Sequence, residues 1–225
     1  MTSSPTSALA VFDLCETLYA ENTTFGFVRF FQARHGRRSG TVLINMLYSR
    51  RLPVFYLLAA LHRFLSLDLC RWVLVRSLRG YHRTQLAEAA RAYAAEVLPR
   101  TAIAETQSRL ARHRAAGDRV IIVSSSLDVV VEAVAEHFGV EWYASRLGYR
   151  DDRCNGRIEY DLTGRKASLV ANLVKDQPVA PVIHAYTDNL SDRDLVAAAD
   201  WPTIIIPAGR TRARWGGIDA VFIEL

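Results

Sequence analysis

Short apolar runs without polar alternation recur along the chain and constrain its fold more than any other feature. A continuous run of this length is typical of a strand that is buried on both faces. Because helical patterns alternate with the runs, we expect a parallel sheet covered by helices on both faces, the doubly wound, Rossmann-like α/β class. The runs span residues 8–14 (ALAVFDL), 119–123 (RVIIV), 141–144, 182–187 and 201–206.

Apolar spacing and turn residues place the remaining elements of this core. The pairs Asp151-Asp152 and Asn155-Gly156 favour a hairpin between residues 148 and 162. Helices are expected at residues 84–97, 101–115, 127–138, 166–174 and 192–199.

A different texture follows the first strand. Residues 25–83 keep a helical pattern, with breaks at Gly36, Pro53 and Gly80 and with no strand-like alternation. We therefore expect an all-helical insert, or cap, within the α/β core. The cap is placed at residues 21–85, and the core at residues 1–20 and 86–225.

The expected cap is strongly basic. Between Arg29 and Arg83 there are eleven arginines and a single acid, Asp68, although the net charge of the chain is only +5. Leu, Phe, Tyr and Trp interleave with the arginines, which argues against a nucleic-acid backbone as the partner. Two interpretations stay open. The arginine stems cover an apolar helix face, or the strip meets an anionic substrate or the surface of a membrane.

Several absences bear on the compartment of the protein. The three cysteines Cys15, Cys70 and Cys154 are odd in number and lack metal-ligand spacing, which favours a reducing compartment without disulfides. Residues 1–8 lack the order of a signal peptide. No uncharged apolar run reaches the roughly 20 residues of a spanning helix. We therefore expect a cytoplasmic protein without a transmembrane segment.

The ends of the predicted strands are where chemistry is expected, because ligands bind at the carboxyl ends of parallel strands. Those positions hold Asp13, Ser124, Asp188 and Asp192, while Lys166 begins a helix, whose amino terminus favours an anion. Carboxylates bind a hard cation, and a lysine with a hydroxyl can hold an anion beside it. This set fits phosphoryl transfer, which depends on positioning and charge compensation.

Four motifs that carry these residues resemble the haloacid dehalogenase superfamily. VFDLCETLY resembles its first motif, in which an apolar strand precedes Asp-x-Asp-x-Thr, and VIIVSSS resembles the second. Gly164-Arg165-Lys166 resembles the third motif, and AYTDNLSD the fourth. The order matches along the whole chain, and the insert resembles the helical cap of the phosphoserine phosphatase-like branch. The resemblance implies a magnesium-dependent phosphatase acting on a small phosphorylated substrate.

The resemblance also implies a role for each matching acid. Asp13 would attack phosphorus and form an aspartyl-phosphate. Mg²⁺ would be held by Asp13, the main-chain carbonyl of Cys15 and Asp188, with Asp192 in support. Asp192 could instead cap its own helix.

Other matching residues would contact the substrate. Ser124 and Lys166 would hold the phosphate oxygens, although the adjacent Ser125 or Ser126 could replace Ser124. Thr17 would lock the loop after the nucleophile. The remaining candidate substrate-binding residues are Glu16, Asn22, Ser125 and Asn189.

Cys15 departs from the family pattern, because phosphatases of this family have a second aspartate there as general acid and base. An unperturbed thiol has a pKa of about 8.5 and is a weak hydrogen-bond donor. General acid–base help contributes about 10² to 10⁴ in rate. Three consequences are open: Glu16 supplies the carboxylate, the substrate has a good leaving group, or the intermediate reacts slowly. In the third case the chain is a phosphotransferase, a dehalogenase-like enzyme or a binding protein for a phosphorylated ligand.

The natural substrate is expected to differ from phosphoserine. Phosphoserine phosphatases have a glutamate nine residues after the nucleophile, and Asn22 occupies that position here. The apolar, arginine-rich cap instead favours an amphiphilic or sugar phosphate.

Overall fold

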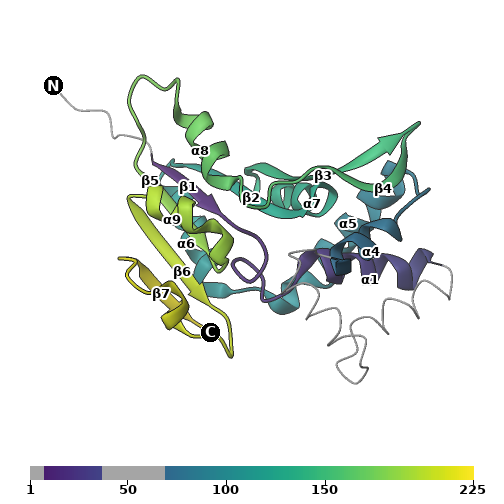
Figure 1. Cartoon of the computed structure of the whole chain (residues 1–225), viewed down its shortest axis with the longest axis horizontal. Coiled ribbons are helices and arrows are strands. Elements are labelled where there is room, and N and C mark those ends of the chain that lie inside the picture. Colours follow the sequence, from purple (N-terminus) through teal and green to yellow (C-terminus); the bar gives the residue numbers. More distant parts are fainter. Residues whose placement is uncertain (1–7, 37–68) are drawn as a thin grey trace.

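The computed structural model describes residues 8–36 and 69–225. Within them, seven strands form one sheet in the order β4-β3-β2-β1-β5-β6-β7. Neighbouring strands are parallel, except for the antiparallel pair β3 and β4 (Figure 1). The strands are β1 (Leu9–Phe12), β2 (Arg119–Leu127), β3 (Glu141–Arg150), β4 (Arg153–Tyr160), β5 (Ile183–Thr187), β6 (Trp201–Ile206) and β7 (Val221–Glu224).

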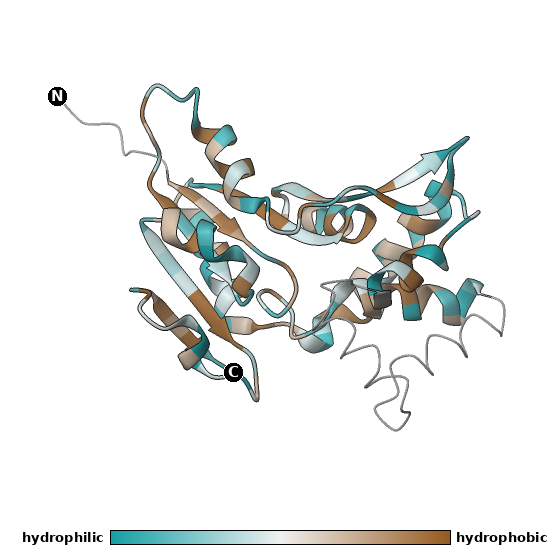
Figure 2. Ribbon diagram, viewed as in Figure 1, coloured by the Kyte–Doolittle hydropathy of each residue, from teal (hydrophilic) through white to brown (hydrophobic). Residues whose placement is uncertain are grey.

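Helices cover both faces of this sheet. Because side chains alternate along a strand, Leu9 and Val11 pack with α8 and α9, whereas Ala10 and Phe12 pack with α6 and α7 on the opposite face. Apolar residues accordingly concentrate along the strands (Figure 2). The doubly wound α/β prediction is confirmed. The helices are α1 (Thr23–His35), α4 (Leu69–Arg76), α5 (Arg83–Glu96), α6 (Ala104–Ala115), α7 (Asp128–Phe138), α8 (Lys166–Val174) and α9 (Arg193–Ala198), with short 3₁₀ turns at Leu98–Thr101, Leu190–Asp192 and Arg212–Trp215.

The hairpin made by β3 and β4 is longer than the sequence analysis predicted. A strand at residues 141–144 and a separate hairpin at residues 148–162 were expected, but β3 runs without a break to Arg150 and extends beyond the rest of the sheet (Figure 1). The turn lies at Asp151 and Asp152, which both have positive φ, as a tight hairpin turn requires. The second turn signal, Asn155-Gly156, lies inside β4 instead. The edge strand β7 was not predicted.

The described part of the cap packs against this hairpin. Main-chain hydrogen bonds join Gly80 N to Cys154 O and Cys154 N to Tyr81 O, at 2.8 and 2.9 Å. Gly156 has a φ of +76°, and a Cβ there would lie 3.3 Å from the carbonyl oxygen of Arg76 and 3.0 Å from Arg79 Cβ. Glycine therefore permits the close approach of β4 to the end of α4.

The cap helices also have an apolar core of their own. Phe27 and Phe31 of α1, Leu74 of α4 and Tyr93 of α5 are fully or almost fully buried. Packing therefore explains most of the apolar composition that the sequence showed in the described part of the cap. The predicted domain boundary at residues 85/86 falls inside α5, and the predicted break at Pro53 lies outside the described residues. No helix in the described ranges is long and apolar enough to cross a membrane.

Candidate active site

The parallel pairing of β1 and β5 places two of the predicted acids side by side. Phe12 is in register with Tyr186, and Asp13 N donates to Tyr186 O at 2.9 Å. Asp13 and Asp188 are therefore both placed just beyond the carboxyl ends of adjacent strands, and both side chains are buried.

Lys166, the first residue of α8, joins the nucleophile candidate to a second acid. Its Nζ lies 2.8 Å from Asp13 Oδ2 and 2.7 Å from Asp192 Oδ2, and all three side chains are buried. Thr187 Oγ1 donates to the same Asp192 oxygen at 2.7 Å. Burial alone would lower the pKa of Lys166, but the charges of Asp13 and Asp192 raise that pKa overall. A protonated lysine therefore stands next to the Asp13 carboxylate.

Asp188 has a different electrostatic environment. Burial, followed by the charge of Asp13, raises the pKa of Asp188 to about 7. Arg210, in the loop after β6, offsets this only in part, with Nη1 3.1 Å from Asp188 Oδ2. The buried and adjacent carboxyl groups of Asp13 and Asp188 therefore favour the binding of a cation next to them.

The donors at this position fit a magnesium ion. Mg²⁺ commonly binds one or two carboxylates and keeps water or phosphate oxygens as its other ligands. Asp13, Asp188 and the main-chain carbonyl of Cys15 supply oxygen donors of this kind. Within the described residues, no group of three or more His, Cys, Asp or Glu side chains is placed to hold a metal. Asp192 is instead engaged with Lys166 and Thr187, and its predicted support of the metal stays a prediction.

The pKa of Asp188 predicts how the stability of the metal-free protein depends on pH. Between about pH 4 and pH 7 the folded state keeps a proton on Asp188 that the unfolded state has lost, so the free energy of unfolding falls as pH rises. Asp188→Asn is expected to remove this part of the pH dependence. Thermal unfolding in a chelator at pH 5 and pH 8 measures it, and magnesium should raise the wild-type Tm at pH 8 but not that of the variant. The same pH slope in both proteins would contradict the prediction.

Cys15 belongs to a small network of neutral groups. Its Sγ lies 3.0 Å from Thr23 Oγ1 and 3.1 Å from Ser126 Oγ, and these two hydroxyls are 2.7 Å apart. Ser124 Oγ extends the network through a 3.3 Å hydrogen bond to Ser126 Oγ. Burial, followed by the charge of Asp13, raises the pKa of the Cys15 thiol. The position of the family's acid–base aspartate is therefore occupied by a protonated thiol at neutral pH.

A cavity of about 280 Å³ brings most of the predicted residues together. Four residues that the sequence analysis did not select as candidates also line it: Thr24, Arg71, Leu74 and Thr163. Ser126, which was weighed as a substitute for Ser124, lies in the wall as well. The predicted residues in the wall are Asp13, Cys15, Asn22, Ser124, Ser125 and Asn189.

Five of the predicted residues do not line this cavity: Glu16, Thr17, Lys166, Asp188 and Asp192. Glu16 has a φ of +50°, a left-handed conformation that glycine adopts without strain. Its charge contributes to the raised pKa of Glu21 and of Asp188, which indicates that its carboxylate lies toward those acids. Thr17 is buried, its main-chain oxygen accepts from Thr106 Oγ1 at 2.5 Å, and its own hydroxyl has no partner among the described residues. Glu16 was predicted to bind substrate, but it lies outside the cavity wall, whereas the predicted role of Thr17 in locking the loop stays a prediction.

Arg71 is the cavity residue that the sequence analysis missed most clearly. It lies in α4, yet its Nη2 donates to the main-chain oxygen of Ser125 at 2.6 Å. Its Nη1 donates to Asp161 Oδ2 at 2.8 Å and to Thr163 Oγ1 at 3.3 Å. Arg71 belongs to the basic strip of the cap, but the sequence contains nothing that distinguishes it from the other arginines there.

Several known proteins are similar to this chain in sequence or in structure. The chain is 24% identical over 202 residues to a probable phosphatase of Mycobacterium tuberculosis, an alignment that covers 88% of this chain and 68% of that protein. A Bordetella pertussis Tohama I protein with unknown function has a similar structure, with a TM-score of 0.74 and 22% identity over 96% of this chain and 98% of that one.

A structure of a phospho-aspartyl intermediate analogue of phosphoserine phosphatase has the same fold, with a TM-score of 0.58 and 16% identity. That likeness covers 96% of this chain and 93% of the other, so the fold of the described residues is phosphoserine phosphatase-like. Residues 10–197, which include the four motifs, match the family of haloacid dehalogenase-like hydrolases. The chain belongs to this family.

Proposed function

We propose that this hydrolase is a magnesium-dependent phosphatase that acts on phosphomonoesters through an aspartyl-phosphate on Asp13. The observation that carries the proposal is the buried contact of Lys166 with both Asp13 and Asp192 beside a cavity that also contains Ser124. A carboxylate, an ammonium group and a hydroxyl at one cavity suit attack on phosphorus and binding of the phosphate oxygens.

The described residues support specific roles in this reaction. Asp13 is the nucleophile, and Lys166 and Ser124 bind phosphate oxygens, with Ser125, Asn22 and Asn189 contacting the rest of the substrate. Mg²⁺, held by Asp13, Asp188 and the Cys15 carbonyl, supplies charge neutralisation at the phosphoryl group. Asp192 orients Lys166 rather than binding the metal directly, because its Oδ2 already accepts from Lys166 and Thr187. The similar fold of a phosphoserine phosphatase that forms a phospho-aspartyl intermediate supports the covalent step.

Cys15 supports an alternative chemistry at the same site. Among the three open consequences, we favour replacement of the missing acid by Glu16 least, because its carboxylate forms no hydrogen bond or ion pair with a site residue in the described ranges, unlike Lys166 and Asp188. The neutral network of Cys15, Thr23 and Ser126 has no group that readily gives up a proton at neutral pH. The second candidate function is therefore phosphotransfer, a dehalogenase-like displacement, or binding of a phosphorylated ligand with slow turnover.

The substrate class follows from the cavity and the cap. Asn22 caps α1 by accepting from Phe25 N at 3.1 Å, so it does not present the carboxylate that would meet the amino group of phosphoserine. We therefore favour an amphiphilic or sugar phosphate that needs little protonation of its leaving group. We propose a small phosphorylated molecule as the substrate and no nucleic-acid partner. We also propose that the enzyme is cytoplasmic. Contact of the cap with a membrane surface is a further proposal.

The proposal is tested by phosphate release from 4-nitrophenyl phosphate, measured with magnesium and with a chelator. We expect release only with magnesium. In parallel, acid-quenched reactions with a ³²P-labelled substrate should leave an acid-stable, hydroxylamine-labile label that peptide mapping places on Asp13. Release without a divalent cation, or a label on another residue, would contradict the proposed mechanism. A stable label with little phosphate release would instead support the phosphotransfer alternative.

A further inference from the structure

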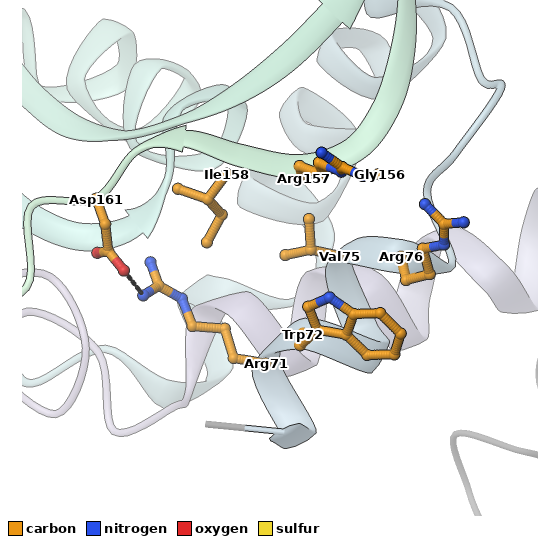
Figure 3. Close-up of a pocket in the computed structure, with 8 residues that line it drawn as sticks. All are labelled: Arg71, Trp72, Val75, Arg76, Gly156, Arg157, Ile158 and Asp161. Carbon is orange, nitrogen blue, oxygen red and sulfur yellow. Dashed lines mark hydrogen bonds and ion pairs between the residues drawn. The ribbon is translucent and has the colours of Figure 1, made fainter. Parts of the chain in front are cut away.

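A second and larger cavity adjoins the first between the cap and the hairpin. This cleft, of about 510 Å³, lies between α4 and β4 (Figure 3). Its volume falls in the range of sites for small organic ligands, whereas the catalytic cavity is below that range. The cleft is lined by Arg71, Trp72, Val75, Arg76, Gly156, Arg157, Ile158 and Asp161.

Arg71 lies at the junction of the two cavities, because it lines both. The same Nη1 contacts Asp161, in the wall of the cleft, and Thr163, in the wall of the catalytic cavity. The side chain of Arg71 is only 16% exposed, so this contact is more than a loose surface ion pair. A molecule with its phosphate beside Asp13 can therefore extend past Arg71 into the cleft.

Part of the wall of the cleft is apolar. Val75 of α4 and Ile158 of β4 project toward the space between these elements, and Trp72 lies next to Val75 (Figure 3). Trp72 is 58% exposed, although Leu74 and Val75 of the same helix are buried. Because exposing an indole forfeits apolar burial, an apolar ligand that covers Trp72 gains binding energy.

Two arginines of the cleft carry positive charge that an anionic group of a ligand can neutralise. Neither Arg76 nor Arg157 forms an ion pair with any acid in the described ranges, and the acid of the cleft, Asp161, is paired with Arg71. The cleft thus combines an apolar wall with unneutralised guanidinium groups. Such groups bind carboxylates and phosphates well.

We propose that this cleft binds the non-phosphate part of the substrate, an apolar, preferably aromatic group that carries a second negative charge. This rests on the proposed function and gives its substrate a more definite chemistry. The phosphate occupies the cavity beside Asp13, and Arg71 bridges the two compartments. The apolar body lies against Trp72, Val75 and Ile158, while Arg76 and Arg157 bind the second anionic group.

Three aryl phosphates with phenol leaving groups of similar acidity test the proposal: phenyl phosphate, biphenyl-4-yl phosphate and its 4′-carboxylated form. We expect kcat/KM to rise about tenfold from phenyl to biphenyl, and about fivefold more with the carboxylate. Trp72→Ala should make kcat/KM about equal for biphenyl and phenyl phosphate. The double variant Arg76→Ala/Arg157→Ala should make kcat/KM about equal for the carboxylated and the plain biphenyl phosphate.

Two matched variants control for surface effects. Trp201→Ala removes another exposed tryptophan, 62% exposed on β6, and Arg112→Ala removes an exposed arginine of α6. Both should keep the wild-type ratios. Equal kcat/KM for phenyl and biphenyl phosphate in the wild type, or a biphenyl advantage that survives Trp72→Ala, would overturn the proposal. A change of oligomeric state in Trp72→Ala, seen by analytical ultracentrifugation, would assign the cleft to a second copy of the chain instead.

The failure of the proposed function can be told apart from the failure of this inference. If the wild type hydrolyses neither phenyl phosphate nor 4-nitrophenyl phosphate with magnesium, the phosphatase proposal fails. Calorimetric binding of 4′-carboxybiphenyl-4-phosphonate, which cannot be hydrolysed, then decides the inference. Binding that weakens at least about tenfold in Trp72→Ala supports the cleft. Binding that is undetectable in the wild type, or equally tight in Trp72→Ala, refutes it.

Discussion

Cys15→Asp is expected to raise magnesium-dependent phosphate release from an alkyl phosphate by about 10²- to 10⁴-fold, the usual worth of a general acid and base. The Sγ position already lies within hydrogen-bonding distance of Thr23 Oγ1 and Ser126 Oγ, so both hydroxyls can orient a carboxylate there. The main-chain N–H of Thr23, at the start of α1, points to the same atom at 3.4 Å. Burial beside Asp13 raises the pKa of the introduced carboxyl, which suits a proton donor.

Cys15→Asn is the matched control for this gain, because it has nearly the shape of aspartate but no ionisable group. Steady-state release from an alkyl phosphate and from 4-nitrophenyl phosphate should be measured for the wild type and both variants. The gain should be confined to Cys15→Asp and should be larger with the alkyl phosphate, whose leaving group needs a proton. Equal gains in both variants would show that removal of an obstructing thiol, and not the addition of a proton donor, causes the gain.

Asp13→Asn is expected to lower phosphate release by at least about 10⁴-fold, because an amide cannot act as the nucleophile that begins the reaction. The fold should persist, since Lys166 keeps its 2.7 Å contact with Asp192 when the Asp13 charge is removed. Thermal unfolding by circular dichroism, run beside the rate assay, establishes that the variant is folded.

Asp128→Asn provides the comparison for Asp13→Asn. Asp128 is also buried and accepts a main-chain hydrogen bond, from Leu147 N at 3.3 Å, but it does not line the catalytic cavity. Its substitution should leave phosphate release within a few-fold of the wild type. Substantial turnover in a folded Asp13→Asn variant would mean that another group attacks the substrate.

Local sequence patterns predicted the core of the fold well, because continuous apolar runs report directly on buried strands. The strands β1, β2, β5 and β6 begin within a residue of the predicted runs, and α8 spans the predicted residues 166–174. The continuation of β3 through residues 145–147 was missed because Arg146 and Leu147 pair only with the antiparallel hairpin strand β4, and the parallel pairing with β2, on which the apolar-run pattern reports, ends at Ser145. The edge strand β7 is short, partly exposed and carries no strong pattern.

The candidate site shows the same division between local and tertiary information. Asp13, Ser124 and Asp188 were predicted from their places at strand ends, where the fold class directs ligands. Arg71 and Arg210 reach Ser125 and Asp188 from distant segments, and no local pattern marks them among 26 arginines. Contacts of this kind are decided by how the cap and the last loops pack, which one sequence does not specify.

The attachment of the cap to the hairpin also bears on how specificity could evolve in such a chain. Gly80, Tyr81 and Arg83 join the hairpin through main-chain atoms of Asp152 and Cys154. Bonds between main-chain groups persist when side chains change, so residues facing the cleft can be exchanged without detaching one wall from the other. Gly156 is the exception, since a Cβ there would crowd Arg79 and Arg76 at 3.0 and 3.3 Å in a backbone conformation of positive φ. The scaffold therefore permits new substrate preferences by single substitutions, provided that this one glycine is retained.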